Sequence, residues 1–248
     1  MSGHSKWSSI KHKKGTADAR RGKIFSKIIK EITVASRLGG GNPEDNPRLR
    51  AAILKAKSAN MPKDNIERGI KKGVGDTDGT NYFENTYEAY GPGGVAILID
   101  TLTDNKNRTA ADVRSTVTKN GGNLGKADCV AYLFKRKGLI VFDAEQYSED
   151  EIFDIALESG AEDVAKEGNS IEVITSPESF ENVLNALQKA GYEHTMAEVT
   201  KIPDNTVELD IEKTQKVLKF IEKLEDLDDV QNVSTNLEIP ENMNFDIE

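Results

Sequence analysis

The sequence predicts an α+β protein with an N-terminal three-helix domain followed by two ferredoxin-like α+β domains, one inserted in the other. Two observations support this. Apolar residues recur at helical spacing between residues 16 and 73, and strand-like and helix-like patterns alternate from residue 95 onward. The chain has 248 residues, enough for two or three domains with real cores. We expect the domains to span residues 1–78, 79–135 plus 206–240, and 136–205.

The N-terminal domain shows three helical segments. Apolar residues at three- and four-residue steps predict a long helix over residues 16–38. Asn46 and Pro47 have the types preferred at an N-cap and at the first helical position, so a second helix should begin there. Pro62 should open a third helix and Gly73 should close it.

The rest of the chain alternates strands and helices. The central series predicts the element order βαββαβ, which is the ferredoxin-like order. Its helices should begin at Ser148, with Glu151 completing a capping box, and at Pro177. The flanking segments repeat that order when the central series is set aside. Their expected strands are residues 95–102, 130–134, 207–211 and 230–237, with helices around residues 110–117 and 217–224.

Charge is segregated along the chain. The first 72 residues hold 18 Lys and Arg but only 6 Asp and Glu, a net charge of +12. The remaining 176 residues hold 15 basic and 36 acidic side chains, a net charge of −21. A basic end on an acidic protein is what a phosphate polymer attracts, and ordinary solvated surfaces mix both signs. We therefore expect the N-terminal domain to bind nucleic acid.

The candidate contacts follow the basic and aromatic residues of this domain. We expect residues 2–14 to form a mobile N-terminal arm, because Trp7 and Ile10 are its only large apolar residues. Trp7 offers a flat surface for stacking on an unpaired base, or it anchors the arm to the helices. The predicted nucleic-acid-binding residues are His4, Lys6, Trp7, Lys11, Lys13, Lys14, Arg20, Arg21, Lys23, Lys27, Lys30, Arg48, Arg50, Lys55, Lys57, Arg68, Lys71 and Lys72.

Other chemistries find no support in the sequence. The glycine-rich stretch 121–126 has one residue too few for a nucleotide-binding P-loop, and Ala127 stands where a magnesium-binding hydroxyl is needed. The single cysteine, Cys129, is typical of a buried structural thiol. The acidic run 222–229 is typical of a solvated helix end. We expect no catalytic residues, metal, cofactor or small-molecule substrate.

The cellular environment follows from similar features. No apolar run approaches the roughly 20 residues of a membrane span, and the N-terminus lacks the apolar segment of a signal peptide. One cysteine suits a reducing compartment. We expect a cytoplasmic protein with no membrane partner.

Several short motifs resemble one known family. They are HSKW at residues 4–7, IKHKK at 10–14, RGKIF at 21–25, NMPKDNIER at 60–68, YGPGG at 90–94, NKNRT at 105–109, GGNLG at 121–125 and AYLF at 131–134. Together they resemble the YebC/PmpR family, closely over the N-terminal and middle regions and loosely over the C-terminal half. The segment 126–129 departs from the expected glycine- or serine-containing turn.

The resemblance implies a function as well as a fold. It implies a helical domain followed by two α+β domains, in a cytoplasmic DNA-binding transcriptional regulator. It also implies an alternative, a translational activator associated with the ribosome and with ribosomal or messenger RNA. The tight connection between the second and third helices favours duplex DNA, whereas a Trp-bearing arm favours unpaired RNA. A third hypothesis is a metal-dependent nuclease, which would need clustered carboxylates beside the basic surface.

Overall fold

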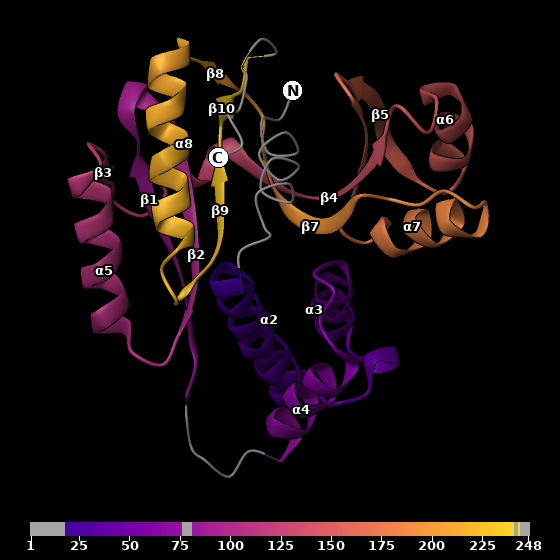
Figure 1. Ribbon diagram of the computed structural model, residues 1–248, viewed down its shortest axis with the longest axis horizontal. Helices are drawn as coiled ribbons and strands as arrows, with labels where there is room; N and C mark the ends of the chain where they lie inside the picture. Colours follow the sequence, from indigo (N-terminus) through magenta and orange to yellow (C-terminus); the bar gives the residue numbers. More distant parts are fainter. Residues whose placement is uncertain (1–17, 76–80, 241–242, 244–248) are drawn as a thin grey trace.

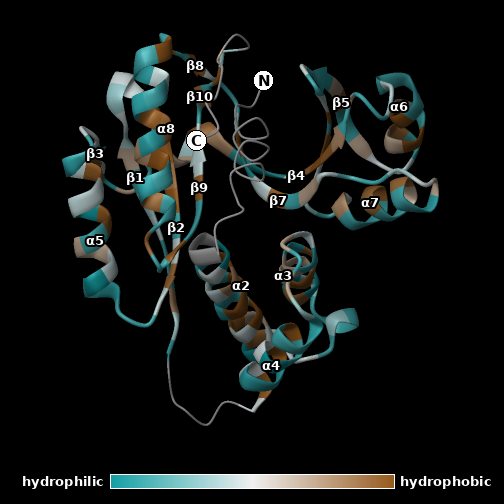
Figure 2. Cartoon of the chain, viewed as in Figure 1, coloured by the Kyte–Doolittle hydropathy of each residue, from teal (hydrophilic) through white to brown (hydrophobic). Residues whose placement is uncertain are grey.

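The computed structural model describes residues 18–75, 81–240 and 243, with side chains from residue 21 onward. Three α-helices come first, and two antiparallel sheets with two main helices each follow them (Figure 1). The protein is therefore α+β, as the sequence predicts. Each helix carries both hydrophilic and hydrophobic residues (Figure 2). None of the helices in the described ranges combines the length and the apolar composition that a membrane crossing requires.

The N-terminal helices pack around their own apolar cluster. They are α2 (Asp18–Gly39), α3 (Pro47–Ser58) and α4 (Lys63–Val74), with a short 3-10 helix, η1 (Pro43–Asp45), between the first two. The Asn46 side chain accepts a hydrogen bond from the Leu49 N–H at 3.0 Å, which confirms the predicted cap. Ile32 and Leu49 are fully buried in the cluster.

Gly73 does not close α4 as expected. It lies inside the helix, which runs on to Val74. A Cβ atom at Gly73 would lie 2.4 Å from the Thr33 carbonyl oxygen of α2. The glycine is there because two helix backbones approach closely, and the local sequence does not reveal that contact.

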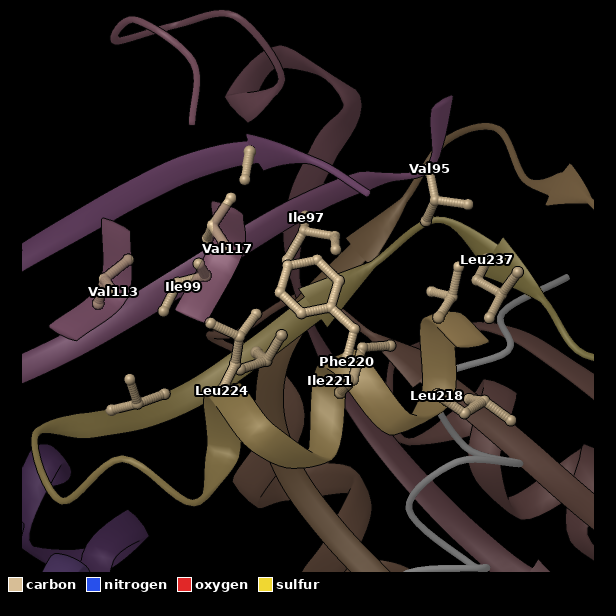
Figure 3. Packing of buried hydrophobic residues seen from close by; sticks show 14 of the residues in the cluster. Val95, Ile97, Ile99, Val113, Val117, Leu218, Phe220, Ile221, Leu224 and Leu237 are labelled. Carbon is tan, nitrogen blue, oxygen red and sulfur yellow. The ribbon is translucent and has the colours of Figure 1, made fainter. Parts of the chain in front are cut away.

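The middle sheet has the strand order β3-β1-β2-β9 and is antiparallel throughout. Helices α5 and α8 cover one face, and side chains such as Ile97, Val117 and Phe220 fill the space between helices and sheet (Figure 3). Its elements are β1 (Phe83–Tyr90), β2 (Ala96–Thr103), α5 (Lys106–Lys119), β3 (Asn123–Leu124), α8 (Ile211–Glu225) and β9 (Val230–Thr235). The short strands β8 (Val207–Glu208) and β10 (Leu237–Glu238) pair separately with each other.

Three expectations for this region are wrong. The strand expected at residues 207–211 is only the two-residue β8, which lies outside the four-stranded sheet, and α8 begins at Ile211. The sequence pattern does not predict β1, yet β1 is a long strand between β2 and β3. The strand expected at residues 130–134 is a turn with a 3-10 helix, η3 (Ala131–Leu133). The Glu88 carboxylate accepts the backbone N–H groups of Asp128, Val130 and Ala131 at 2.6 to 2.9 Å, so these groups are unavailable to a sheet.

The second sheet has the strand order β5-β6-β4-β7. The element order is β4 (Phe134–Asp143), α6 (Glu149–Glu158), β5 (Ala161–Glu167), β6 (Ser170–Thr175), α7 (Phe180–Lys189) and β7 (Met196–Pro203). Order and pairing together give the ferredoxin-like arrangement that the sequence predicts. Ser148 and Glu151 form the expected capping box. We propose to divide the chain into domains along these two sheets and the helical cluster.

Candidate nucleic-acid interface

The predicted interface divides into residues that contact the rest of the protein and residues that face solvent. Six of the predicted residues, His4, Lys6, Trp7, Lys11, Lys13 and Lys14, lie outside the described residues, and the side chain of Arg20 is not described. Arg21 is exposed at the start of α2.

Three lysines of α2 contact the middle domain. Lys23, Lys27 and Lys30 lie at four- and three-residue steps, so they share one side of the helix. The Lys23 ammonium donates to the Asp226 carbonyl at 3.2 Å, and the Lys27 ammonium donates to the Glu225 carbonyl. These carbonyls lie at the C-terminal end of α8, where the helix dipole is negative and cations are stabilised. Figure 1 shows the α8–β9 connection beside the N-terminal half of α2.

Lys30 ends in a polar network centred on Asp229. Its ammonium lies 2.9 Å from the Asp229 carboxylate and also donates to the Leu102 and Asp228 carbonyls at 3.2 and 3.3 Å. The Asp229 side chain is only 7% exposed. The sequence pattern predicts a solvated end for this acidic run, and for Asp229 that is wrong.

The middle domain supplies the other partners of Asp229. Arg108 lies 2.6 Å from the carboxylate, and the hydroxyls of Thr103 and Thr109 donate to it at 3.0 and 2.8 Å. Burial opposes ionisation of Asp229, but hydrogen bonds from Arg108, Lys30 and Thr109 outweigh burial and hold its pKa at about 2. The carboxylate is therefore ionised at neutral pH, and its charge lies next to Lys30 of α2.

Helix α3 makes a second set of contacts. Arg48 pairs with Glu31 of α2 at 2.7 Å and with Glu84 of β1 at 2.6 Å. Arg50 pairs with Glu181 of α7 at 2.6 Å and donates to two carbonyls beside η1, those of residues 43 and 44. These two arginines use their guanidinium groups within the protein.

Lys55 lies farther from its acidic partner. Its ammonium is 3.9 Å from the Glu198 carboxylate of β7. Leu54 beside it packs against the apolar cluster between the second sheet and its helices. In the described part of the chain, α3 thus contacts the second sheet and its helix α7 through Leu54 and through two partly exposed ion pairs, Arg50–Glu181 and Lys55–Glu198.

The remaining predicted cations face solvent. Lys57, Arg68, Lys71 and Lys72 are exposed, and none of them forms an ion pair with an acid in the described part of the chain. Arg68, Lys71 and Lys72 lie at three- and four-residue steps on one side of α4. Arg68 bonds only within its own helix, to the Asn65 side chain and the Asp64 carbonyl. We call these four residues the α4 cationic face; three of them lie on α4, and Lys57 lies in the last turn of α3.

Other motifs that the sequence suggests lie away from these cations. Gly93, at φ +78°, belongs to the turn between β1 and β2. The Cys129 thiol is partly buried beside Glu88, and burial, together with the Glu88 charge, raises its pKa. Among described residues, no three His, Cys, Asp or Glu side chains form a group that could hold a metal.

Sequence reasoning misses the partners of the basic residues. Asp229 and Arg108 are the most important of these, because they connect α2 to the middle domain. The acidic run that contains Asp229 gives a compositional signal. Nothing in the local sequence, however, indicates that a residue 199 positions away from Lys30 lies against it.

Two family models match the chain over most of its length. The model described as the TACO1/YebC protein N-terminal domain matches residues 5–76. The model described as the TACO1/YebC second and third domain matches residues 82–237.

Curated proteins and a solved structure are similar over nearly the whole chain. A protein of Treponema denticola is 61% identical over 97% of this chain and 98% of its own length. A protein of Borrelia garinii is 58% identical over 98% of this chain and 100% of its own. Both are named probable transcriptional regulatory protein. A conserved hypothetical protein of Aquifex aeolicus has a crystal structure with a TM-score of 0.81 at 52% identity, covering 91% of this chain and 93% of that one.

Proposed function

Because this chain belongs to the TACO1/YebC family, we propose that it is a non-enzymatic regulator of gene expression that binds nucleic acid through its N-terminal helical domain. The names of its relatives support a regulatory role. The observation that carries the nucleic-acid part is the α4 cationic face, four exposed cations with no acidic partner among the described residues. Cations left to solvent remain available to phosphates, whereas paired cations must first break a contact.

A substitution of two lysines tests the proposal. Lys71→Ala with Lys72→Ala should weaken binding to nucleic acid and reduce the slope of log K against log salt by about 2 on duplex DNA. A matched control is Lys119→Ala with Lys126→Ala, which removes the same charge from exposed positions of the middle domain. If both double variants bind equally well, the α4 face is not the binding surface.

The kind of nucleic acid decides between two regulatory roles. We propose duplex DNA as the principal ligand of a transcriptional regulator, in keeping with the names of the relatives. The alternative is ribosomal or messenger RNA, recognised by a translation factor at the ribosome. Trp7 separates them, because stacking on an unpaired base is worth about 1 to 3 kcal/mol and duplex bases are already stacked. A loss of RNA affinity in Trp7→Ala with unchanged DNA affinity and melting temperature would favour the translational role.

A further inference from the structure

The lysines of α2 donate hydrogen bonds to a row of oxygen atoms in the middle domain, much as they would to the phosphate oxygens of a nucleic acid. Lys23, Lys27 and Lys30 follow one another along the helix and meet carbonyl oxygens of residues 225, 226 and 228 and the Asp229 carboxylate. The acceptors are oxygens at the negative end of α8, as phosphate oxygens would be. The side of α2 that the sequence assigns to nucleic acid is therefore already occupied from within the chain.

We propose that this contact, the α2–α8 clasp, is an autoinhibitory contact that nucleic acid must open to engage the lysines of α2. The proposal rests on the proposed function, because it concerns access to the same domain. In the closed state the α4 cationic face and the exposed end of α2 are available to phosphates, whereas Lys23, Lys27 and Lys30 are not. In the open state Lys23, Lys27 and Lys30 contact phosphates, and the acidic end of α8 turns to solvent.

The composition of the clasp suits reversible opening. The described apolar residues of the helical cluster all belong to α2, α3, α4 and their connections, so no apolar core joins α2 to α8. A cleft of about 640 Å³ lies beside the clasp, lined by residues that include Lys23 of α2, Tyr82, and Asp226 and Leu227 of the α8–β9 connection. The Lys23 side chain is 48% exposed. Water can therefore reach the clasp, and its polar contacts can be exchanged for others.

Asp229 remains satisfied when the clasp opens. Arg108, Thr103 and Thr109 belong to its own domain and keep their hydrogen bonds to the carboxylate. Opening therefore leaves no unpaired buried charge, which would cost far more than an exchange of partners. Lys30 gains phosphates in place of Asp229. The group formed by Asp229, Arg108, Thr103 and Thr109 is present in both states. It can bind Lys30 of α2 again when the nucleic acid dissociates.

The first test compares two substitutions at neighbouring acids in the full chain. Asp229→Asn removes the carboxylate of the clasp. Asp228→Asn removes the same charge from an exposed side chain that serves the clasp only through its backbone carbonyl. An affinity limited by the fraction of open molecules rises when the closed state is weakened. Asp229→Asn should bind single-stranded RNA and duplex DNA about fivefold more tightly than wild type, and Asp228→Asn less than about twofold more tightly.

The second test measures the opening directly and does not depend on the stability of Asp229→Asn. Spin labels at Asp64→Cys on α4 and Glu212→Cys on α8, in a Cys129→Ser background, report the separation of the two domains by pulsed electron spin resonance. Both labelled positions replace acids, so every cation stays in place. The separation should lengthen when saturating RNA or DNA oligonucleotide is added.

The outcomes separate the two proposals. If the labelled protein binds an oligonucleotide without a change in separation, or if Asp229→Asn and Asp228→Asn bind alike, the clasp is not autoinhibitory. The proposed function stands in that case. If wild type binds neither RNA nor DNA, the proposed function itself fails, and the clasp is only a structural contact between domains.

Discussion

Asp229→Asn should also destabilise the protein in a way that depends on pH. An ordinary aspartate has a pKa of 3.8 and Asp229 has a pKa of about 2. At 1.36 kcal/mol per pKa unit, ionised Asp229 contributes about 2 kcal/mol to the free energy of unfolding. Because the folded-state pKa is depressed, this contribution is complete above pH 3.8 and is lost as pH falls through 2.

The substitution should therefore cost about 2 to 3 kcal/mol at pH 7. Removing one partner of a buried ion pair often costs more than this, but Arg108 is 47% exposed and can be solvated by water once Asp229 is replaced. Asp228→Asn should change the stability by less than about 0.5 kcal/mol. Urea titrations of wild type and both variants measure these differences.

The pH dependence provides the decisive comparison. At pH 3 the difference between wild type and Asp229→Asn should have fallen to about half of its value at pH 7. A double-mutant cycle with Lys30→Met should give a coupling of about 1 kcal/mol, because three of the four groups that bond to Asp229 remain. A difference that does not change between pH 7 and pH 3 would show that Asp229 acts through packing, and the electrostatic reasoning would be refuted.

Three further predictions concern other buried groups. Burial and the nearby Glu167 charge raise the pKa of Glu172 to about 7. Ionisation of Glu172 therefore destabilises the fold increasingly as pH rises from 4.5 to 7. Glu172→Gln should increase the free energy of unfolding by up to about 3 kcal/mol at neutral pH and leave it unchanged below about pH 4. Gly73→Ala should lower the melting temperature, because its Cβ would lie 2.4 Å from the Thr33 carbonyl oxygen. Gly22→Ala is the control: its Cβ would have no neighbour within 4 Å, so the substitution should raise the free energy of unfolding by up to about 1 kcal/mol. Glu88→Gln should cost about 1 to 3 kcal/mol and increase proteolysis after Lys126, since one amide oxygen cannot accept all three N–H groups; resistance to cleavage equal to wild type would contradict this.

Local chemistry explains which parts of the fold the sequence could predict. The Asn46 cap and the Ser148 capping box need only residues a few positions away, and both are present. Strand β1 escapes prediction because the pattern of FENTYEAY is mostly exposed or partly buried, and its pairing partners supply its stability. The turn at residues 130–134 depends on Glu88, 40 to 43 residues away. Periodicity contains no information about such partners.

The nucleic-acid interface is also hard to predict from the sequence, because it depends on contacts between distant residues. Composition correctly indicates that the helical domain is basic, but it assigns Lys30 and Lys71 to the same surface. Lys30 contacts a buried acid, and Lys71 is exposed on α4. What separates them is a contact across 199 positions of sequence. Charge counting treats both lysines alike, because it includes no information on which acids the fold brings near.

The segregation of charge has two opposite consequences for binding. Charges of +12 and −21 on the two parts of one chain attract phosphates to the helical domain and also attract that domain to the acidic domains. Salt weakens both attractions, so raising salt opens the clasp while it disfavours the nucleic acid. The lysines of α2 should then add little to the net salt dependence. The four cations of the α4 face should contribute about −4 to the slope on duplex DNA, and the three lysines of α2 would bring this contribution to about −6. The slope for Asp229→Asn should be steeper than that for wild type, because without the Asp229 carboxylate only carbonyl oxygens such as those of residues 225, 226 and 228 remain as internal partners that offset the release of counterions.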